Sequence, residues 1–217
     1  MTDRLSPESV YLPISALRAA GMIAPKSDVR YYLEGTLLER RGGVTRLVTT
    51  DGQMLLLQVI TEADNPGEDF ELILPRHFGE IRRPKKQDSQ LLHLVIDWTQ
   101  EPPRLTGYNN GAKVEGFAID GKYPNWRSVI PDRPSGELCF LDPRMMEVMY
   151  RAAFEVRAGP IDKDKRRFDV YQNGDGPAVL RFRTNCYVLG LVSPYREPDN
   201  ADAWPTISYL KNGEGTA

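Results

Sequence analysis

The alternation of hydrophobic and polar positions along the chain predicts the same order of elements three times. In each round a strand is followed by a helix and then by three further strands. The first round is predicted at residues 10–13 (strand), 15–24 (helix), and 29–39, 44–49 and 54–60 (strands). Ser15 is the expected N-cap of its helix, and Asp51-Gly52 forms a turn before its last strand.

The second and third rounds follow the same order. The second is predicted at 70–74 (strand), 75–83 (helix), and 91–98, 104–108 and 113–119 (strands). The third is predicted at 137–141 (strand), at a helix that Asp142 caps and Pro143 begins, and at 168–172, 178–183 and 187–193 (strands). The buried stripe of this last helix is expected at Met145, Val148, Met149, Ala152 and Val156.

These elements predict an α+β protein with three βαβββ units and with helices on one face of antiparallel sheets. Residues 10–122 are expected to form a complete domain of two units, and 137–197 a half domain of one unit. A connector at 123–136 joins them, and 198–217 is a tail. Because Pro124 and Pro131 restrict the backbone, the connector is expected to be a fixed structure.

Composition narrows the class of protein. The 217 residues are 41% apolar and 27% charged, as in ordinary soluble proteins. The net charge of −2 conceals basic runs at 76–86 and 163–167, so a nucleic-acid partner is not excluded. Cys139 and Cys186 form no disulfide framework or metal spacing, which favours a cytoplasmic protein without a metal or cofactor. No signal peptide is expected, and no run approaches the ~20 apolar residues that span a membrane.

Four collinear motifs indicate a family. They are Asp28-Val-Arg-Tyr-Tyr-Leu-Glu-Gly35, Thr50-Asp51-Gly52, Ile73-Leu74-Pro75-Arg76 and Asp120-Gly-Lys-Tyr-Pro-Asn-Trp-Arg-Ser-Val-Ile-Pro131. Together they resemble the middle domain of the bacterial DNA sliding clamp, the β subunit of DNA polymerase III. Residues 140–156 resemble a helix of the clamp's third domain, and 176–196 resemble the last strands of that domain.

Two departures from the family pattern stand out. Nothing in the chain resembles the first domain of the clamp. The first half of the third domain is also missing, because only five residues separate Pro131 from Glu137. The resemblance implies the DNA-clamp fold, in which helices line the hole of a six-domain ring and sheets lie outside.

The resemblance also implies sequence-independent contact with double-stranded DNA. A sliding ring needs contacts to phosphates rather than to base edges. The candidates on predicted helices are Arg76, His77, Arg82, Arg83, Arg144 and Arg151, and Lys26 lies near a position where the family contacts DNA. The alternative for each is a solvated helix face.

A second implied function is docking of short peptide motifs from polymerases, clamp loaders or repair proteins. Matched by position, the pocket is expected at Leu33, Thr50, Gly52, Gln53, Met54, Leu55, Pro124, Ser128, Val129, Leu191, Val192, Ser193, Pro194, Tyr195 and Arg196. Its floor is apolar, and Arg196 offers a charged donor at the rim. The family usually has basic residues at the positions of Met54 and Ser128, and a methionine at that of Ser193, so an altered preference is expected. The alternative is that these are core and edge residues.

A lone half domain would expose a sheet edge and an apolar helix face, which proteins avoid. We therefore expect half domains of two subunits to pair about a two-fold axis and rebuild a whole domain. Such a dimer would hold three domains, so a ring of six domains would be a homo-tetramer.

Enzymatic function is not expected, because no phosphate-binding loop, metal spacing or nucleophile elbow is present. The resemblance implies a processivity factor that encircles DNA. The alternative is an accessory protein that does not encircle DNA and either competes for clamp-binding peptides or caps a clamp subunit. A continuous positive surface on the helices would favour the ring, and divergent basic side chains would favour the accessory protein. The apolar patch at 204–210 could occupy a pocket or pack on a neighbour.

Overall fold

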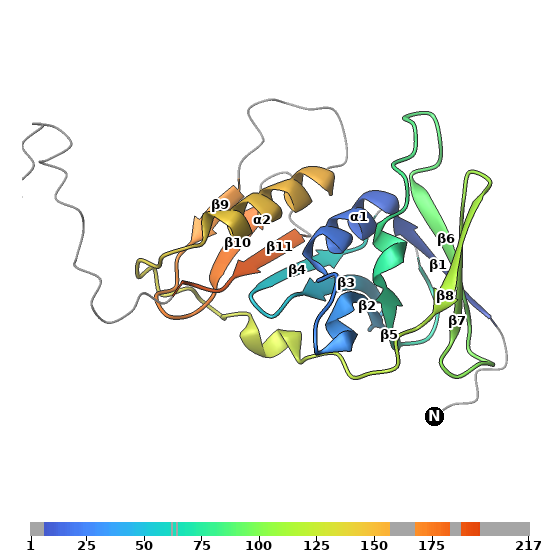
Figure 1. Cartoon of the computed structure of the whole chain (residues 1–217), viewed down its shortest axis with the longest axis horizontal. Coiled ribbons are helices and arrows are strands. Elements are labelled where there is room, and N and C mark those ends of the chain that lie inside the picture. The colour runs from blue at the N-terminus through green and yellow to red at the C-terminus, as the bar shows by residue number, and fades with distance from the viewer. Residues whose placement is uncertain (1–6, 62, 64, 157–167, 183–187, 196–217) are drawn as a thin grey trace, which may run out of the picture.

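The computed structural model describes residues 7–61, 63, 65–156, 168–182 and 188–195. This part of the chain forms two antiparallel sheets and two α-helices (Figure 1). The predictions for the basic run at 163–167, for Cys186, for Arg196 and for the tail lie outside the described residues. None of the described helices is long and apolar enough to cross a membrane.

The two sheets differ in size. The smaller has the order β1 (Glu8–Pro13), β6 (Leu91–Asp97), β7 (Arg104–Asn109) and β8 (Ala112–Phe117). The larger has seven strands in the order β5 (Phe70–Pro75), β2 (Gly35–Arg41), β3 (Val44–Thr50), β4 (Met54–Val59), β11 (Val188–Val192), β10 (Ala178–Phe182) and β9 (Phe168–Tyr171). Tight turns at Gly42-Gly43 and Asn110-Gly111 join neighbouring strands, and all four turn residues have positive φ angles.

The first two rounds of elements exchange their first strands. β1 precedes α1 in the first round, yet it pairs with β6 of the second round. Conversely, β5 of the second round pairs with β2 of the first. This reciprocal pairing binds the two rounds into one unit.

Two α-helices lie over the same face of the seven-stranded sheet (Figure 1). They are α1 (Ile14–Ile23) and α2 (Pro143–Glu155), and their apolar faces share one buried cluster with β4, β10 and β11. Ala19 and Ile23 of α1 meet Met149 and Ala152 of α2 in this cluster. Because β4 also pairs with β11, helix packing and strand pairing join the third round to the first at one seam.

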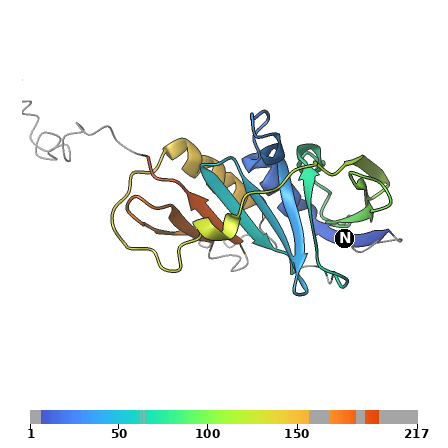
Figure 2. The same cartoon turned by 90° about the horizontal axis from the view of Figure 1, so that it is seen from below.

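The opposite face of the same sheet is buried as well. Strand residues alternate in direction, so Leu56 faces the helices while Leu55 faces the other side. There the connector folds over the sheet, with its turn η3 (Trp126–Val129) crossing β4 and β11 (Figure 2). The helices and the connector therefore cover opposite faces.

The α+β class with antiparallel sheets is confirmed, but two predicted element boundaries are wrong. The strand expected at 29–39 begins only at Gly35, because the 3₁₀ turn η1 (Tyr31–Glu34) precedes it. The first helix begins at Ile14 after Pro13, and no side chain caps its N-terminus, so Ser15 is not the N-cap. By contrast, Asp142 caps α2 as expected, accepting a hydrogen bond from the Arg144 amide at 2.8 Å.

Two predicted elements are absent from the described chain. Residues 75–83 form only the 3₁₀ turn η2 (Arg76–Gly79), because backbone packing of Gly79 against Gly21 of α1 holds this segment close to the helix. The strand expected at 137–141 is not formed, because no neighbouring strand pairs with this segment. Its apolar side chains Leu138 and Phe140 are 75% and 63% exposed.

Candidate functional site

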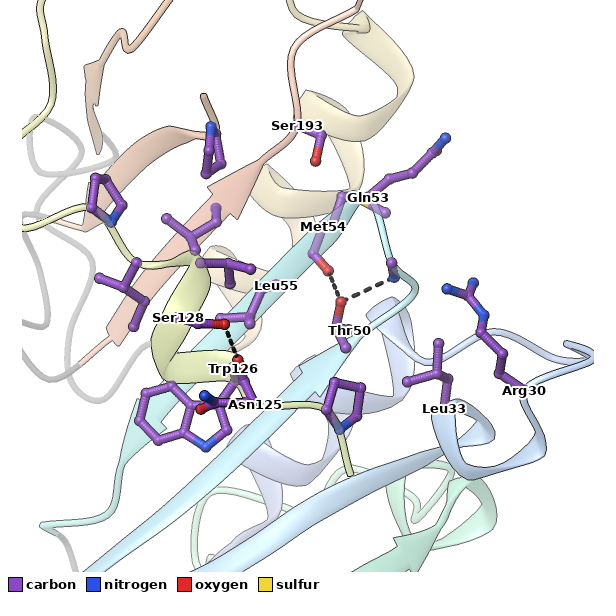
Figure 3. Close-up of a pocket in the computed structure, with 17 residues that line it drawn as sticks. Arg30, Leu33, Thr50, Gln53, Met54, Leu55, Asn125, Trp126, Ser128 and Ser193 are labelled. Carbon is purple, nitrogen blue, oxygen red and sulfur yellow. Dashed lines mark hydrogen bonds between the residues drawn. The ribbon is translucent and has the colours of Figure 1, made fainter. Parts of the chain in front are cut away.

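A pocket of about 600 Å³ lies on the sheet face that the connector covers (Figure 3). Its walls come from three separate parts of the chain, at residues 30–55, 124–131 and 177–193. At its floor Leu55 of β4 and Leu191 of β11 are cross-strand neighbours. The pocket therefore spans the seam between the first and third rounds.

The structure brings together eleven of the residues expected at this pocket. They are Leu33, Thr50, Gly52, Gln53, Met54, Leu55, Pro124, Ser128, Val129, Leu191 and Ser193. Val192 instead faces the helices and is fully buried in the cluster below them. Pro194 and Tyr195 are not among the lining residues, and Arg196 lies outside the described chain.

One wall is a tight turn between β3 and β4. The Asp51 carboxylate accepts hydrogen bonds from the amides of Gln53 and Met54, at 2.8 and 2.6 Å. The Thr50 hydroxyl donates to the Met54 carbonyl and accepts from the Gly52 amide, as Figure 3 shows. Gly52 has a φ of +92°, a value that favours glycine. The turn is thus fixed by its own side chains.

The connector wall is anchored at two points. The Thr50 amide donates to the Tyr123 hydroxyl at 3.0 Å, and burial raises the pKa of this tyrosine well above its usual value. Arg127 donates to the buried Glu39 carboxylate at 2.6 Å and covers the Trp126 ring with its guanidinium. These contacts make the connector a fixed wall of the pocket, in agreement with the expectation from its prolines.

Arg30 lies at the rim and was missed as a pocket residue, although the motif at 28–35 contains it. Its guanidinium donates to Asp28 at 2.9 Å and to the Asp51 carbonyl at 3.2 Å. Hydrogen bonds from Arg30 lower the pKa of Asp28 to about 2, so both groups remain charged at neutral pH. Position matching also missed Asn125, Trp126, Ile130, Pro131 and Pro177.

One of the candidate basic residues, Arg83, shares a buried carboxylate with an arginine of α1. Arg83 forms an ion pair with Glu155 of α2, and Arg18 of α1 binds the same carboxylate at 2.7 Å. Burial of the Glu155 carboxyl opposes its ionisation, but the hydrogen bonds from Arg83 and Arg18 outweigh burial and lower its pKa. This cluster connects α1, α2 and the segment after η2.

Other candidate cations also have nearby partners. Arg76 pairs with Glu80 and donates to backbone carbonyls at the end of α1, and His77 hydrogen-bonds the Glu115 carbonyl. On α2, Arg144 pairs with Asp142 and Arg151 with Glu147. Lys26 and Arg82 are exposed, and neither forms an ion pair within the described residues. The described helix face therefore carries mixed charge rather than a continuous positive surface.

Comparison with known proteins gives sequence relatives for part of the chain. No family model matches it. The beta sliding clamp of Salmonella typhimurium is 34% identical over 118 residues, covering 51% of this chain and 29% of the relative. That of Haemophilus influenzae is 30% identical over 142 residues, covering 60% of this chain and 36% of the relative. The matched segments thus span only about a third of these curated relatives.

Solved structures are similar over most of the described fold. The DNA polymerase III beta subunit of Thermotoga maritima has a TM-score of 0.66 at 13% identity, covering 91% of this chain and 68% of that chain. The DNA polymerase sliding clamp of Pseudomonas aeruginosa has a TM-score of 0.64 at 17% identity, covering 88% of this chain and 66% of that chain. The chain therefore has the fold of the bacterial DNA sliding clamp, and the resemblance of its sequence to part of that family is confirmed.

Proposed function

We propose that this protein is a cytoplasmic, non-catalytic processivity factor of the sliding clamp type. In this proposal a homo-oligomeric ring, a tetramer by domain count, encircles double-stranded DNA. Polymerases, clamp loaders or repair proteins dock on it through short peptide motifs. The clamp fold and the partial sequence similarity to beta sliding clamps support the proposal.

The pocket at the β4–β11 seam is the observation that supports docking most directly. Its volume of about 600 Å³ is in the range of sites that bind small ligands or a few side chains. Leu33, Met54 and Leu55 give it an apolar floor, and Arg30 places a charge at its rim. An extended peptide with two or three apolar side chains suits this combination.

Peptide binding to a surface variant tests the docking function. Val129 lines the pocket yet is 47% exposed, so Val129→Asp should disturb binding without unfolding the chain. Fluorescence anisotropy with a panel of labelled, leucine- and phenylalanine-rich pentapeptides should show binding that the variant weakens at least tenfold, or about 1.4 kcal/mol.

Val29→Asp is the matched control, because Val29 is 99% exposed and does not line the pocket. It should bind the peptides as the unaltered protein does. Docking at this pocket is wrong if none of the peptides binds the unaltered protein, or if Val129→Asp binds them equally well.

Contact with DNA is proposed for the seven basic residues named from the sequence. Lys26 and Arg82 are the strongest candidates among them, because both are exposed and form no ion pair within the described chain. Phosphate contacts need not exclude paired arginines, since exposed ion pairs contribute little free energy and can be exchanged.

The mixed charge of the helix face favours a second candidate function. Arg83, Arg144 and Arg151 each have a carboxylate partner, which reduces the positive potential available to phosphates. An accessory protein that occupies clamp-binding peptides without encircling DNA would need the pocket but no positive surface. Retention on circular DNA distinguishes the two candidates.

A further inference from the structure

The first strand of each complete round has its pairing partner in the other round. β1 leads into α1 and pairs with β6, while β5 leads into η2 and pairs with β2. In both cases the partner is the strand that directly follows the helix or turn of the sibling round. Each round thus depends on a second round, its sibling, in two ways. The sibling provides the strand that pairs with its first strand, and the first strand of the sibling pairs with its own strand after the helix or turn.

The third round has no sibling within the chain. Its strand after the helix is β9, which pairs with β10 on one side and has no described strand on the other. β9 forms the end of the seven-stranded sheet farthest from β5, as Figure 1 shows. β5 covers the outer edge of β2. Within the described chain, no strand covers the equivalent outer edge of β9.

The segment at 137–141 has the sequence of a first strand without the pairing. It reads Glu137-Leu-Cys-Phe-Leu-Asp-Pro143, against Glu8-Ser-Val-Tyr-Leu-Pro13 for β1 and Glu71-Leu-Ile-Leu-Pro75 within β5. All three lead into the next helix or turn through a proline. Leu138 and Phe140 are 75% and 63% exposed, whereas Leu72 and Leu74, at the corresponding positions of β5, are buried. In β1 these positions are Ser9 and Tyr11, and both are exposed.

We propose that a second copy of this chain supplies the missing sibling. Segment 137–141 of each copy pairs antiparallel with β9 of the other, in the manner of β1 with β6 and β5 with β2. The two exchanges are related by a two-fold axis, so each copy presents the same surface to the other. The assembly therefore closes as a dimer. Pairing extends the sheet through both copies and removes Leu138 and Phe140 from water.

The other described sheet edges are protected within the chain, which singles out β9. Asn65 accepts from the Tyr11 amide at 2.7 Å and donates to its carbonyl at 3.0 Å, and so blocks the edge of β1. Ile119 bridges to Ile73 along the edge of β5. Charged residues protect β8, where Lys113 and Arg104 pair with Glu115.

Existing contacts leave room for this exchange. The Gly136 amide donates to the Gln172 carbonyl, and the Gly174 amide to the Glu137 carbonyl, both at 3.0 Å. These bonds lie beyond Tyr171, where β9 ends, so they place the start of the segment next to the strand without occupying its edge. The Cys139 amide donates to the Gln172 side-chain oxygen at 3.0 Å, and the Phe140 carbonyl accepts from the Tyr195 amide at 2.7 Å. Pairing replaces these two bonds with a ladder.

The dimer specifies the homo-oligomer of the proposed function, but its test needs neither DNA nor peptide. Light scattering or sedimentation should give a mass of two chains, or of four if the ring closes, where one chain is 24.6 kDa. Leu138→Asp combined with Phe140→Asp should halve that mass, because it removes the exchange and no other contact between copies. Both side chains are exposed within one copy, so their replacement leaves its core unchanged. Val29→Asp, which changes a side chain that is 99% exposed elsewhere, should keep the mass of the unaltered protein.

A disulfide trap locates the contact. In a background with Cys139→Ser and Cys186→Ser, chains carrying Leu138→Cys are mixed with chains carrying Val170→Cys and are then oxidised. A disulfide-linked pair containing one chain of each kind supports the exchange. The proposal is overturned by a single-chain mass for the unaltered protein, by an unchanged mass for the Leu138→Asp, Phe140→Asp variant, or by the absence of a mixed pair in the trap. Peptide binding by that variant keeps this result separate from the docking proposal.

Discussion

Two buried carboxylates connect parts of the protein that are distant in sequence. Glu39 and Glu155 are 3% and 7% exposed, and each accepts hydrogen bonds from two arginines. Glu39 holds the connector against the β2–β3 hairpin through Arg127. Glu155 holds α2 against α1 through Arg18. A buried carboxylate is stable only when paired, so both positions fix geometry as well as charge.

Glu155→Gln should destabilise the protein by about 2 kcal/mol at neutral pH, because one arginine loses its acceptor oxygen and the other keeps only a hydrogen bond to a neutral amide. The folded-state pKa of Glu155 lies below the ordinary 4.5, so its stabilising effect is present above pH 4.5 and is lost as the pH falls through the lowered pKa. Urea unfolding at several pH values should show the difference between variant and unaltered protein shrinking under acid conditions. An equal difference at every pH would show that the charge of Glu155 contributes nothing.

At the scale of elements, α1 and η2 meet through two glycines. A Cβ at Gly79 would lie 2.8 Å from both the Gly21 Cα and the Leu17 carbonyl oxygen. This contact brings the η2 backbone directly onto the helix, and Arg76 reinforces it by donating to the Gly21 carbonyl at 3.1 Å. The turn η2, packed against α1, stands where the sequence predicts a helix at 75–83.

Gly79→Ala should therefore lower the free energy of unfolding by about 1–3 kcal/mol, because the added methyl group overpacks this contact. Thermal denaturation followed by circular dichroism measures the loss. Gly42→Asn is the control, since a Cβ there meets nothing within 4 Å and asparagine tolerates its φ of +59°. Equal melting temperatures for Gly79→Ala and the unaltered protein would contradict the close packing of the turn.

Local patterns predicted the elements that depend on local chemistry. The turn at Asp51-Gly52, the Asp142 cap and the strands of both sheets follow from residue preferences and alternation. Segment 137–141 has the pattern of a strand but forms none, because strand formation depends on a partner that the described chain does not supply. The turn η2 differs for a related reason, since its docking on Gly21 is a tertiary contact that periodicity does not reveal.

The pocket was largely predictable by position, because the turn at 50–52 and the connector carry the motifs that indicate the family. Arg30 was missed because its side chain reaches the rim by folding back on Asp28 and the Asp51 carbonyl. Val192 was misplaced because neighbouring strand residues face opposite sides, so Leu191 enters the pocket while Val192 enters the helix layer. One-residue errors of this kind are expected wherever a strand is buried on both faces.

At the scale of the whole molecule, the two proposed contacts lie on opposite faces of one sheet. Helix α1 and helix α2, which carries Arg144 and Arg151, cover one face, and the connector and pocket lie on the other (Figures 1 and 2). Under the proposal, a peptide in the pocket would therefore not compete for space with DNA on the helix side. The reciprocal exchange at β9 would extend this two-sided layer from one copy to the next.

Retention on DNA of different topology tests the central claim most directly. Labelled protein is incubated with nicked circular plasmid, and the mixture is separated by gel filtration before and after a single restriction cut. A closed ring should stay with the circular DNA and leave after linearisation, and the Leu138→Asp, Phe140→Asp variant should not be retained on either form. Equal retention on circular and linear DNA, or no retention on circular DNA, would contradict encirclement and favour the accessory protein.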